Sequence, residues 1–134
     1  KEFIFFAVEN RNIENTNYFV YSKTGQFAQE PLITEASLLL DGKLRFDSLP
    51  EFYYRSVFPD NVHSVIPTKY VYTMPFSIKP EDNQPTGSLN ASKFNDITLF
   101  LKLPSGNVDL TLYVFAISYN VLIIENGALT MEFM

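Results

Sequence analysis

Residues 74–92 read MPFSIKPEDNQPTGSLNAS and form the most distinctive stretch of the chain. Pro80 and Pro85 each fix their own backbone torsion, lack an N–H donor and bias the preceding residue toward extended geometry. A regular hydrogen-bonded ladder cannot cross such a stretch, so we expect a structured connection. Gly87 suits a turn in which the glycine takes a positive φ. The stretch is therefore expected to shape a loop rather than to carry out a reaction.

The side chains of Asn90 and Ser92 can bond to nearby backbone groups and fix the end of this loop. The same two residues match a glycosylation acceptor, but a three-residue pattern is common by chance and a structural role is simpler. The structural motif that we expect comprises Pro75, Phe76, Pro80, Gln84, Pro85, Gly87, Asn90, Ser92 and, further along, Asn120.

The order of residues in this stretch resembles the C-terminal jelly roll of the double jelly-roll major capsid proteins of nucleocytoplasmic large DNA viruses. Residues 112–122 are similar to the penultimate strands of that family, 126–133 to its terminal strand, 1–5 to its opening strand, and 40–46 to a hairpin that ends in Arg-Phe. Many members have an aromatic residue where Ala91 stands and Arg-Ile-Asp at positions 93–95. The resemblance is therefore that of a divergent relative.

The resemblance implies a structural function. Members of the family carry two jelly rolls in each polypeptide, and three polypeptides form a pseudo-hexagonal capsomer of an icosahedral shell. Residues 1–134 would be a single jelly-roll domain, the second roll of such a protein. The expected partners are other capsid subunits in a homotrimer, a preceding jelly roll and minor capsid proteins. The expected location is the virion capsid, assembled in the host cell.

Periodicity independently predicts an all-β fold. Apolar runs occupy residues 3–8, 18–21, 32–40, 43–46, 70–78, 97–103, 108–117, 119–124 and 128–133, and turn residues separate them. Asp41-Gly42 favours a type I′ turn and a hairpin. Pro75 places its strand at an edge or a bulge. About eight strands with uneven connections indicate an eight-stranded antiparallel jelly-roll sandwich with long irregular loops.

Helical structure is expected in one place only. Pro50 followed by Glu51 permits a short helix within residues 48–56, with Phe52 and Tyr53 on its buried side, although a turn fits equally well. Residues 9–17 and 58–68 are polar or proline-containing and are expected to be irregular connections.

Two strands are apolar on both faces, whereas a sandwich strand is normally polar on its outer face. The strands are residues 3–8 and 112–117, and the candidate interface residues are Phe3, Phe5, Tyr113, Phe115 and Ile117. A neighbouring jelly roll or subunit would cover the outer faces. The alternative is that long loops of the same domain fold over them.

Composition excludes several function classes. The chain has 134 residues, which fits one domain with a sizeable core. It has no cysteine, so disulfides and thiolate sites are excluded. Its formal charge is −5 and its 10 basic residues are scattered, so direct nucleic-acid binding is not expected. No run of about 18 apolar residues is present, and no membrane span is expected.

The residue pattern shows no catalytic, cofactor or metal site. His63 is the single histidine, and it has no acid or nucleophile at a recognisable spacing, so a solvated or hydrogen-bonded loop residue is expected rather than a general base. A cupin-type jelly-roll enzyme needs several metal-ligand histidines. The competing class is a carbohydrate-binding or adhesive β-sandwich module, with Tyr53, Tyr54 and Tyr70 as stacking platforms. The acidic residues 81–83 are expected to form a solvated loop tip.

Overall fold

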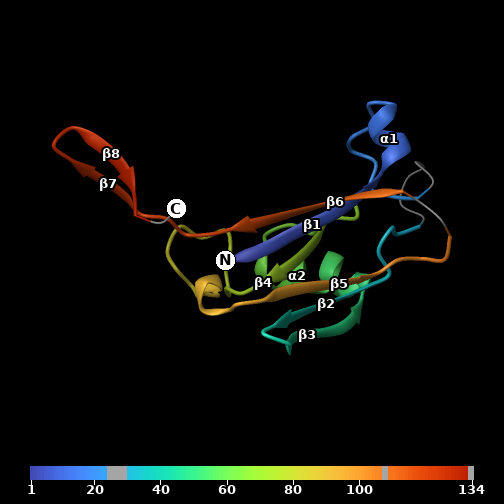
Figure 1. Ribbon diagram of the computed structural model, residues 1–134, viewed down its shortest axis with the longest axis horizontal. Coiled ribbons are helices and arrows are strands. Elements are labelled where there is room, and N and C mark those ends of the chain that lie inside the picture. The colour runs from blue at the N-terminus through green and yellow to red at the C-terminus, as the bar shows by residue number, and fades with distance from the viewer. Residues whose placement is uncertain (24–29, 107–108, 133–134) are drawn as a thin grey trace.

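Two three-stranded antiparallel sheets form the body of the molecule, and a separate two-stranded hairpin extends from it (Figure 1). The computed structural model describes residues 1–23, 30–106 and 109–132. One sheet has the strand order β4-β1-β6 and the other β3-β2-β5. The strands are β1 (Glu2–Glu9), β2 (Glu35–Leu40), β3 (Lys43–Pro50), β4 (Tyr72–Pro75), β5 (Ile97–Lys102), β6 (Leu110–Ile117), β7 (Leu122–Glu125) and β8 (Ala128–Met131). The predicted eight-stranded antiparallel fold is confirmed.

The core lies between the two sheets and is built from alternate residues of the central strands. Phe5 and Ala7 of β1 are buried, as are Ala36, Leu38 and Leu40 of β2. The rings of Phe5 and Tyr72 lie with centroids 5.3 Å apart. This period of two is what a strand requires when one of its faces is covered.

The β2–β3 hairpin forms where Asp41-Gly42 predicted it. Asp41 has φ 47° and Gly42 has φ 73°, as a type I′ turn requires. The Asp41 carboxylate also accepts the backbone N–H groups of Asn95 and Asp96, at 2.8 and 2.9 Å. The turn residue therefore fixes the entry to β5 as well as the hairpin.

The helical content is larger than the sequence predicted. The helices are α1 (Asn10–Glu14), the π-helical segment η1 (Tyr53–Val57), α2 (Phe58–Val62) and the 3₁₀ segment η2 (Ala91–Lys93). The expected irregular connections at residues 9–17 and 58–68 are thus partly helical. Pro59 stands in α2 directly after η1, where it removes one N–H donor from a continuous helical stretch. The candidate strand at residues 18–21 does not form, and these residues lie in turn and irregular structure.

The buried face of the η1–α2 segment differs from the prediction. Phe52 and Tyr53 are exposed, and Tyr54 is fully buried. The Tyr54 hydroxyl donates to the carbonyl oxygens of Ala36, at 2.8 Å, and Asp47, at 3.0 Å. Burial, reinforced by the charge of Asp47, raises the pKa of Tyr54 to about 12. The segment is therefore held to both strands of the β2–β3 hairpin by one phenol.

Replacing Tyr54 by phenylalanine is expected to lower the free energy of unfolding by about 1–2 kcal/mol, because two carbonyls lose a buried donor while the ring still packs. Urea unfolding would measure the change. Tyr53→Phe is the matched control, since Tyr53 is exposed, and its stability should stay within about 0.5 kcal/mol of the parent chain. Equal stability of the two variants would contradict this role for Tyr54.

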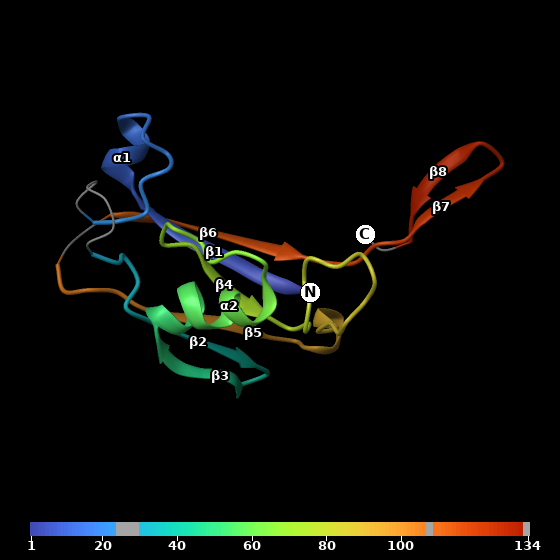
Figure 2. The same ribbon diagram turned by 180° about the vertical axis from the view of Figure 1, so that it is seen from behind.

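The β7–β8 hairpin lies away from both sheets at one end of the molecule, and α1 lies at the other end (Figures 1 and 2). The strands β7 and β8 pair with each other and with no other described strand. The sequence placed residues 119–124 and 128–133 among the sandwich strands, whereas the structure puts both segments in this arm. Two positions of the predicted strands, 108 and 133, lie outside the described residues.

Candidate assembly interface

The outer face of β6 carries an aromatic and aliphatic row. Tyr113 lies opposite Phe6 of β1, Phe115 opposite Ile4, and Ile117 opposite Glu2. Residues directly opposite each other in an antiparallel pair point to the same face of the sheet. The Phe6 ring stacks on Tyr113 with centroids 5.2 Å apart. We call Tyr113, Phe115 and Ile117 the β6 face.

The domain's own loop covers only part of this surface. Tyr21 packs on Phe6 with ring centroids 4.6 Å apart. Over β1, therefore, a loop of the same domain covers the outer face, as the alternative in the sequence analysis predicted. The β6 face extends beyond that cover, since Phe115 is 50% exposed and Ile117 40%. An exposed apolar row of this kind is typical of an interaction surface.

Two of the five predicted interface residues point inward instead. Phe5 is fully buried in the core, and Phe3 packs against the core with its ring edge-on to Phe76 at 5.2 Å. Both residues alternate with Ile4 and Phe6, so they occupy the core face of β1. We therefore remove Phe5 and Phe3 from the candidate interface and retain Tyr113, Phe115 and Ile117.

The β7–β8 hairpin supplies a second apolar surface that sequence reasoning missed. Leu122 lies opposite Met131, and Ile124 opposite Leu129, so the four side chains share one face. All four are more than half exposed. We call them the hairpin face. The alternation of apolar residues on both arms of Asn126-Gly127 was a signal for it, but this pattern equally fits a strand buried in a sandwich.

The base of this arm is tied by Asn120. Its side-chain oxygen accepts the backbone N–H of Val121 at 2.8 Å, and its amide nitrogen lies 3.5 Å from the sulfur of Met131. The backbone N–H of Glu132 donates to the Val121 carbonyl at 2.9 Å. The contacts of the Asn120 side chain therefore fix the backbone at the point where the chain leaves β6 and enters the β7–β8 hairpin.

The loop after β4 is closed by a threonine that the predicted motif omitted. Thr86 Oγ1 accepts the backbone N–H of Lys79 at 2.9 Å and donates to the Lys79 carbonyl at 3.1 Å. Tyr119 accepts the Thr86 backbone N–H at 3.3 Å through its hydroxyl, which also lies 3.5 Å from the Gln84 carbonyl. The loop that contains Pro80 and Pro85 is thus anchored to the end of β6, next to the β6 face.

Three other motif residues lie where the backbone needs them. Pro75 ends β4, which is an edge strand of its sheet. Asn90 caps η2 by accepting the backbone N–H of Ser92 at 3.1 Å. Gly87 has φ +125°, and a Cβ atom there would lie 3.3 Å from the Phe76 carbonyl oxygen. These contacts support a structural role for the motif.

Replacing Gly87 by alanine is expected to lower the free energy of unfolding by about 2–4 kcal/mol, because a positive φ of this size is strained for any L side chain and the new methyl group crowds Phe76. Gly106→Ala is the matched control, since Gly106 has φ +133° but open space around a Cβ atom. Thermal unfolding should show a larger loss for Gly87→Ala than for the control. An unchanged melting temperature for Gly87→Ala would exclude the proposed constraint.

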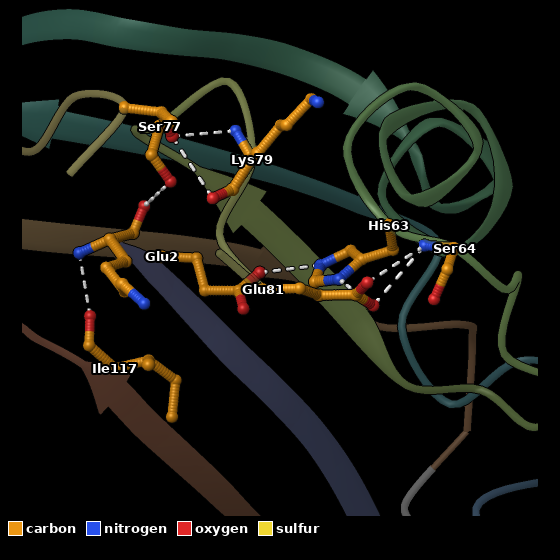
Figure 3. Close-up of polar contacts among 9 residues, drawn as sticks. Glu2, His63, Ser64, Ser77, Lys79, Glu81 and Ile117 are labelled. Atoms are coloured by element: carbon orange, nitrogen blue, oxygen red, sulfur yellow. Dashed lines mark hydrogen bonds and ion pairs between the residues drawn. The ribbon is translucent and has the colours of Figure 1, made fainter. Parts of the chain in front are cut away.

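His63 bridges two carboxylates instead of standing free (Figure 3). Its Nε2 lies 2.8 Å from Glu2 Oε2, and its Nδ1 lies 3.1 Å from Glu81 Oε1. Glu81 also accepts the Ser64 backbone N–H at 3.3 Å. Of the two alternatives expected for His63, solvated or hydrogen-bonded, the structure shows the hydrogen-bonded one, and Glu81 is engaged rather than freely solvated. The cluster joins the start of β1, the end of α2 and the loop after β4.

Hydrogen bonds from Ser64, with a smaller contribution from His63, hold the pKa of Glu81 below its ordinary value. A lowered pKa in the folded state adds stability above the unfolded pKa, and this stability is lost as the pH falls through the folded pKa. Glu81→Gln should therefore be less stable than the parent chain at neutral pH and equal to it in acid. Melting temperatures across a pH series would measure this, with exposed Glu125→Gln as the control. A constant difference at all pH values would contradict the linkage.

Few features of the described residues point to a catalytic, metal-binding or sugar-binding site. Among them, no group of three or more His, Asp or Glu side chains could hold a metal ion. No helix in the described residues is long and apolar enough to cross a bilayer. The tyrosines expected as sugar-stacking platforms do not form one, because Tyr54 is fully buried and the Tyr70 ring, also buried, lies under the Arg55 guanidinium at 5.0 Å.

A family model described as the large eukaryotic DNA virus major capsid protein matches residues 1–130. The chain belongs to this family. The resemblance predicted from residues 74–92 is thereby confirmed, and the match extends over nearly all of the chain. The jelly-roll fold is confirmed too, because the chain superposes over its whole length, with a TM-score of 0.80 and 19% identity, on the PBCV-1 protein VP54.

Several capsid protein relatives are similar in sequence. The chain is 31% identical over 123 residues to the major capsid protein of Chrysochromulina ericina virus, covering 86% of this chain and 21% of that protein. It is 28% identical over 131 residues to that of Paramecium bursaria Chlorella virus 1, covering 80% and 30%. A quasi-atomic model of the PBCV-1 capsid also matches, with a TM-score of 0.78, 22% identity, and 100% and 43% coverage. The chain thus spans less than half the length of these capsid proteins.

Proposed function

We propose that this chain is a shell-forming part of a major capsid protein, which assembles into trimeric pseudo-hexagonal capsomers of an icosahedral virion. Family membership supports a capsid role, and the observation that carries the assembly role is the exposed apolar surface. The β6 face and the hairpin face both present large apolar side chains to solvent. A preceding jelly roll, a subunit of the trimer and minor capsid proteins are the proposed partners.

Assembly of this kind needs no reactive group. Association free energy comes from burying apolar side chains at a packed interface with a polar rim. The β6 face is partly aromatic, and the hairpin face lies on an arm that reaches away from the body (Figure 2). An arm whose two strands pair only with each other gains stability when its apolar face packs against a neighbour, since an isolated two-stranded hairpin is marginally stable in water.

Light scattering coupled to size-exclusion chromatography tests the proposal on the complete capsid polypeptide that contains these residues. The proposal predicts a trimer whose mass does not change on dilution through the micromolar range. A monomer at all concentrations, with a folded circular dichroism spectrum, would contradict it. Shell-like particles or capsomer arrays in electron micrographs of the same sample are the expected second result.

A further inference from the structure

The tip of the β7–β8 hairpin is Asn126-Gly127, the one place in the chain where glycine follows asparagine. Asn126 has φ 50° and Gly127 has φ 78°, the positive pair that a type I′ turn requires. Both residues are exposed. Glu125 pairs with Ala128 across the turn, so Asn126 and Gly127 are the whole loop. The register of the hairpin therefore depends on a two-residue loop in contact with water.

The side chain of Asn126 can react with the backbone of the residue that follows it. The Gly127 nitrogen loses its proton and attacks Asn126 Cγ, the Cγ–Nδ2 bond breaks, and ammonia leaves after taking up one proton. Water then opens the resulting succinimide ring at either carbonyl. One opening gives aspartate, and the other gives isoaspartate, in which the main chain runs through the side-chain carbon. Glycine favours the attack, because no side chain shields its nitrogen.

Two features of the structure leave this pair free to react. The Asn126 side chain makes no hydrogen bond to any of the residues that the structure describes. Among the described strands, β7 and β8 pair only with each other, so no neighbouring strand holds the turn (Figure 1). An isolated two-stranded hairpin is marginally stable in water. Bringing the Gly127 nitrogen to Asn126 Cγ therefore needs only a local opening of this hairpin.

The β2–β3 turn has a similar backbone geometry but is held in place. Asp41 has φ 47° and Gly42 has φ 73°. The Asp41 carboxylate accepts the backbone N–H groups of Asn95 and Asp96, and β2 lies between β3 and β5. A side chain held in this way cannot turn onto the next nitrogen without losing both hydrogen bonds. Comparing the two turns therefore separates the effect of the dipeptide from the effect of its surroundings.

We propose that Asn126-Gly127 is a self-modification site, at which the β7–β8 hairpin converts its own turn to isoaspartate or aspartate without an enzyme. The new carboxylate stands next to Glu125, in a hairpin that has no basic residue. Isoaspartate adds one carbon to the main chain of a two-residue loop, so Glu125 and Ala128 no longer meet in register. The strands then separate, and the hairpin face is lost with them. This inference does not depend on trimer formation.

Peptide mapping by mass spectrometry tests the modification on the complete capsid polypeptide, dissociated to single subunits and incubated in buffer. Asn126 should convert at least about tenfold faster than Asn83, an exposed asparagine that precedes Gln84. The rate should rise about tenfold per pH unit, because the attacking nitrogen must first lose its proton. Equal conversion of Asn126 and Asn83, or an Asn126 that stays intact, would overturn the proposal.

A variant of the held turn tests the role of the surroundings. Asp41→Asn places the same dipeptide in the β2–β3 turn, where the amide oxygen can still accept both backbone N–H groups. Position 41 should convert at least about tenfold more slowly than Asn126 in the same molecule, because the reaction there must break two side-chain hydrogen bonds. Equal rates at the two positions would overturn the role assigned to the free hairpin.

Hydrogen exchange tests the structural consequence, after chromatography has separated the unmodified and isoaspartate forms. Amides within residues 122–131 should exchange at least about tenfold faster in the isoaspartate form. Asn126→Gly is the control, because Gly-Gly also forms a type I′ turn but carries no amide that can react. Its hairpin should keep constant exchange rates throughout the incubation. Equal exchange in the two forms of the parent protein would overturn the predicted loss of pairing.

Discussion

Replacing Phe115 and Ile117 together by serine is expected to abolish capsomer formation while leaving the subunit folded. Both side chains are about half exposed on the β6 face, so their removal changes the core little. If their exposed halves are buried on assembly, the lost interface free energy is about 1.5–3 kcal/mol per subunit, because full burial of one such side chain is worth roughly 1.5–3 kcal/mol. Sedimentation velocity would then show single subunits where the parent protein sediments as a trimer.

A matched variant separates a specific interface from a general loss of surface hydrophobicity. Leu44 and Val65 are more exposed than Phe115, at 62% and 74%, and lie away from β6. Their replacement by serine should leave the trimer intact. Unfolding free energies of both double variants should stay within about 1 kcal/mol of the parent protein. Normal capsomer yield from the Phe115 and Ile117 variant would contradict the assigned role of the β6 face.

Replacing Phe5 by alanine is expected to lower the free energy of unfolding by about 3–5 kcal/mol, because the truncation leaves a cavity between the sheets. Phe5 is fully buried against the rings of Tyr54 and Tyr72. Phe100→Ala is the control, since Phe100 is 55% exposed on β5, and it should cost less than about 1 kcal/mol. Urea unfolding gives both values.

A second substitution keeps this prediction testable if Phe5→Ala does not accumulate as folded protein. Phe5→Leu retains most of the buried volume and should cost clearly less than Phe5→Ala, in the range of about 1–2 kcal/mol. The order parent, leucine and alanine in stability is the expected result. A Phe5→Ala variant as stable as the parent would place Phe5 outside the core, and a Phe5→Leu variant that does not fold would contradict the predicted order.

Local turn chemistry made parts of the fold predictable from sequence. Asp41-Gly42 determined the position of the β2–β3 hairpin because both residues must take positive φ, and few residue pairs do so readily. Gly87 was recognised for the same reason. Pro75 indicated an edge strand because proline cannot donate to a ladder.

The predictions that failed concern which face of an element meets the core. Phe5 and Phe6 are adjacent and equally apolar, so composition does not reveal which of them points inward, and the sequence assigned Phe5 to the interface. Tyr54 was overlooked beside Phe52 and Tyr53 because its hydroxyl needs carbonyl acceptors from β2 and β3, which only the folded chain brings to it. Which of two adjacent apolar side chains faces the core is therefore determined by tertiary contacts.

The hairpin face was missed for a related reason. Leu122, Ile124, Leu129 and Met131 alternate as a half-buried strand pair does, and nothing local shows that the pair leaves the sandwich. Thr86 and Tyr119 were missed because their contact joins two segments that are distant in sequence. The outward side chains of β6, Tyr113, Phe115 and Ile117, could therefore be predicted from the sequence, but the hairpin face could not.

Hydroxyl-radical footprinting of intact virions and of dissociated subunits tests the central claim most directly. If the β6 face and the hairpin face are buried in the shell, Phe115, Ile117, Leu129 and Met131 should be oxidised at least about tenfold more slowly in virions than in free subunits. Equal oxidation rates at these four side chains in the two samples would contradict the account.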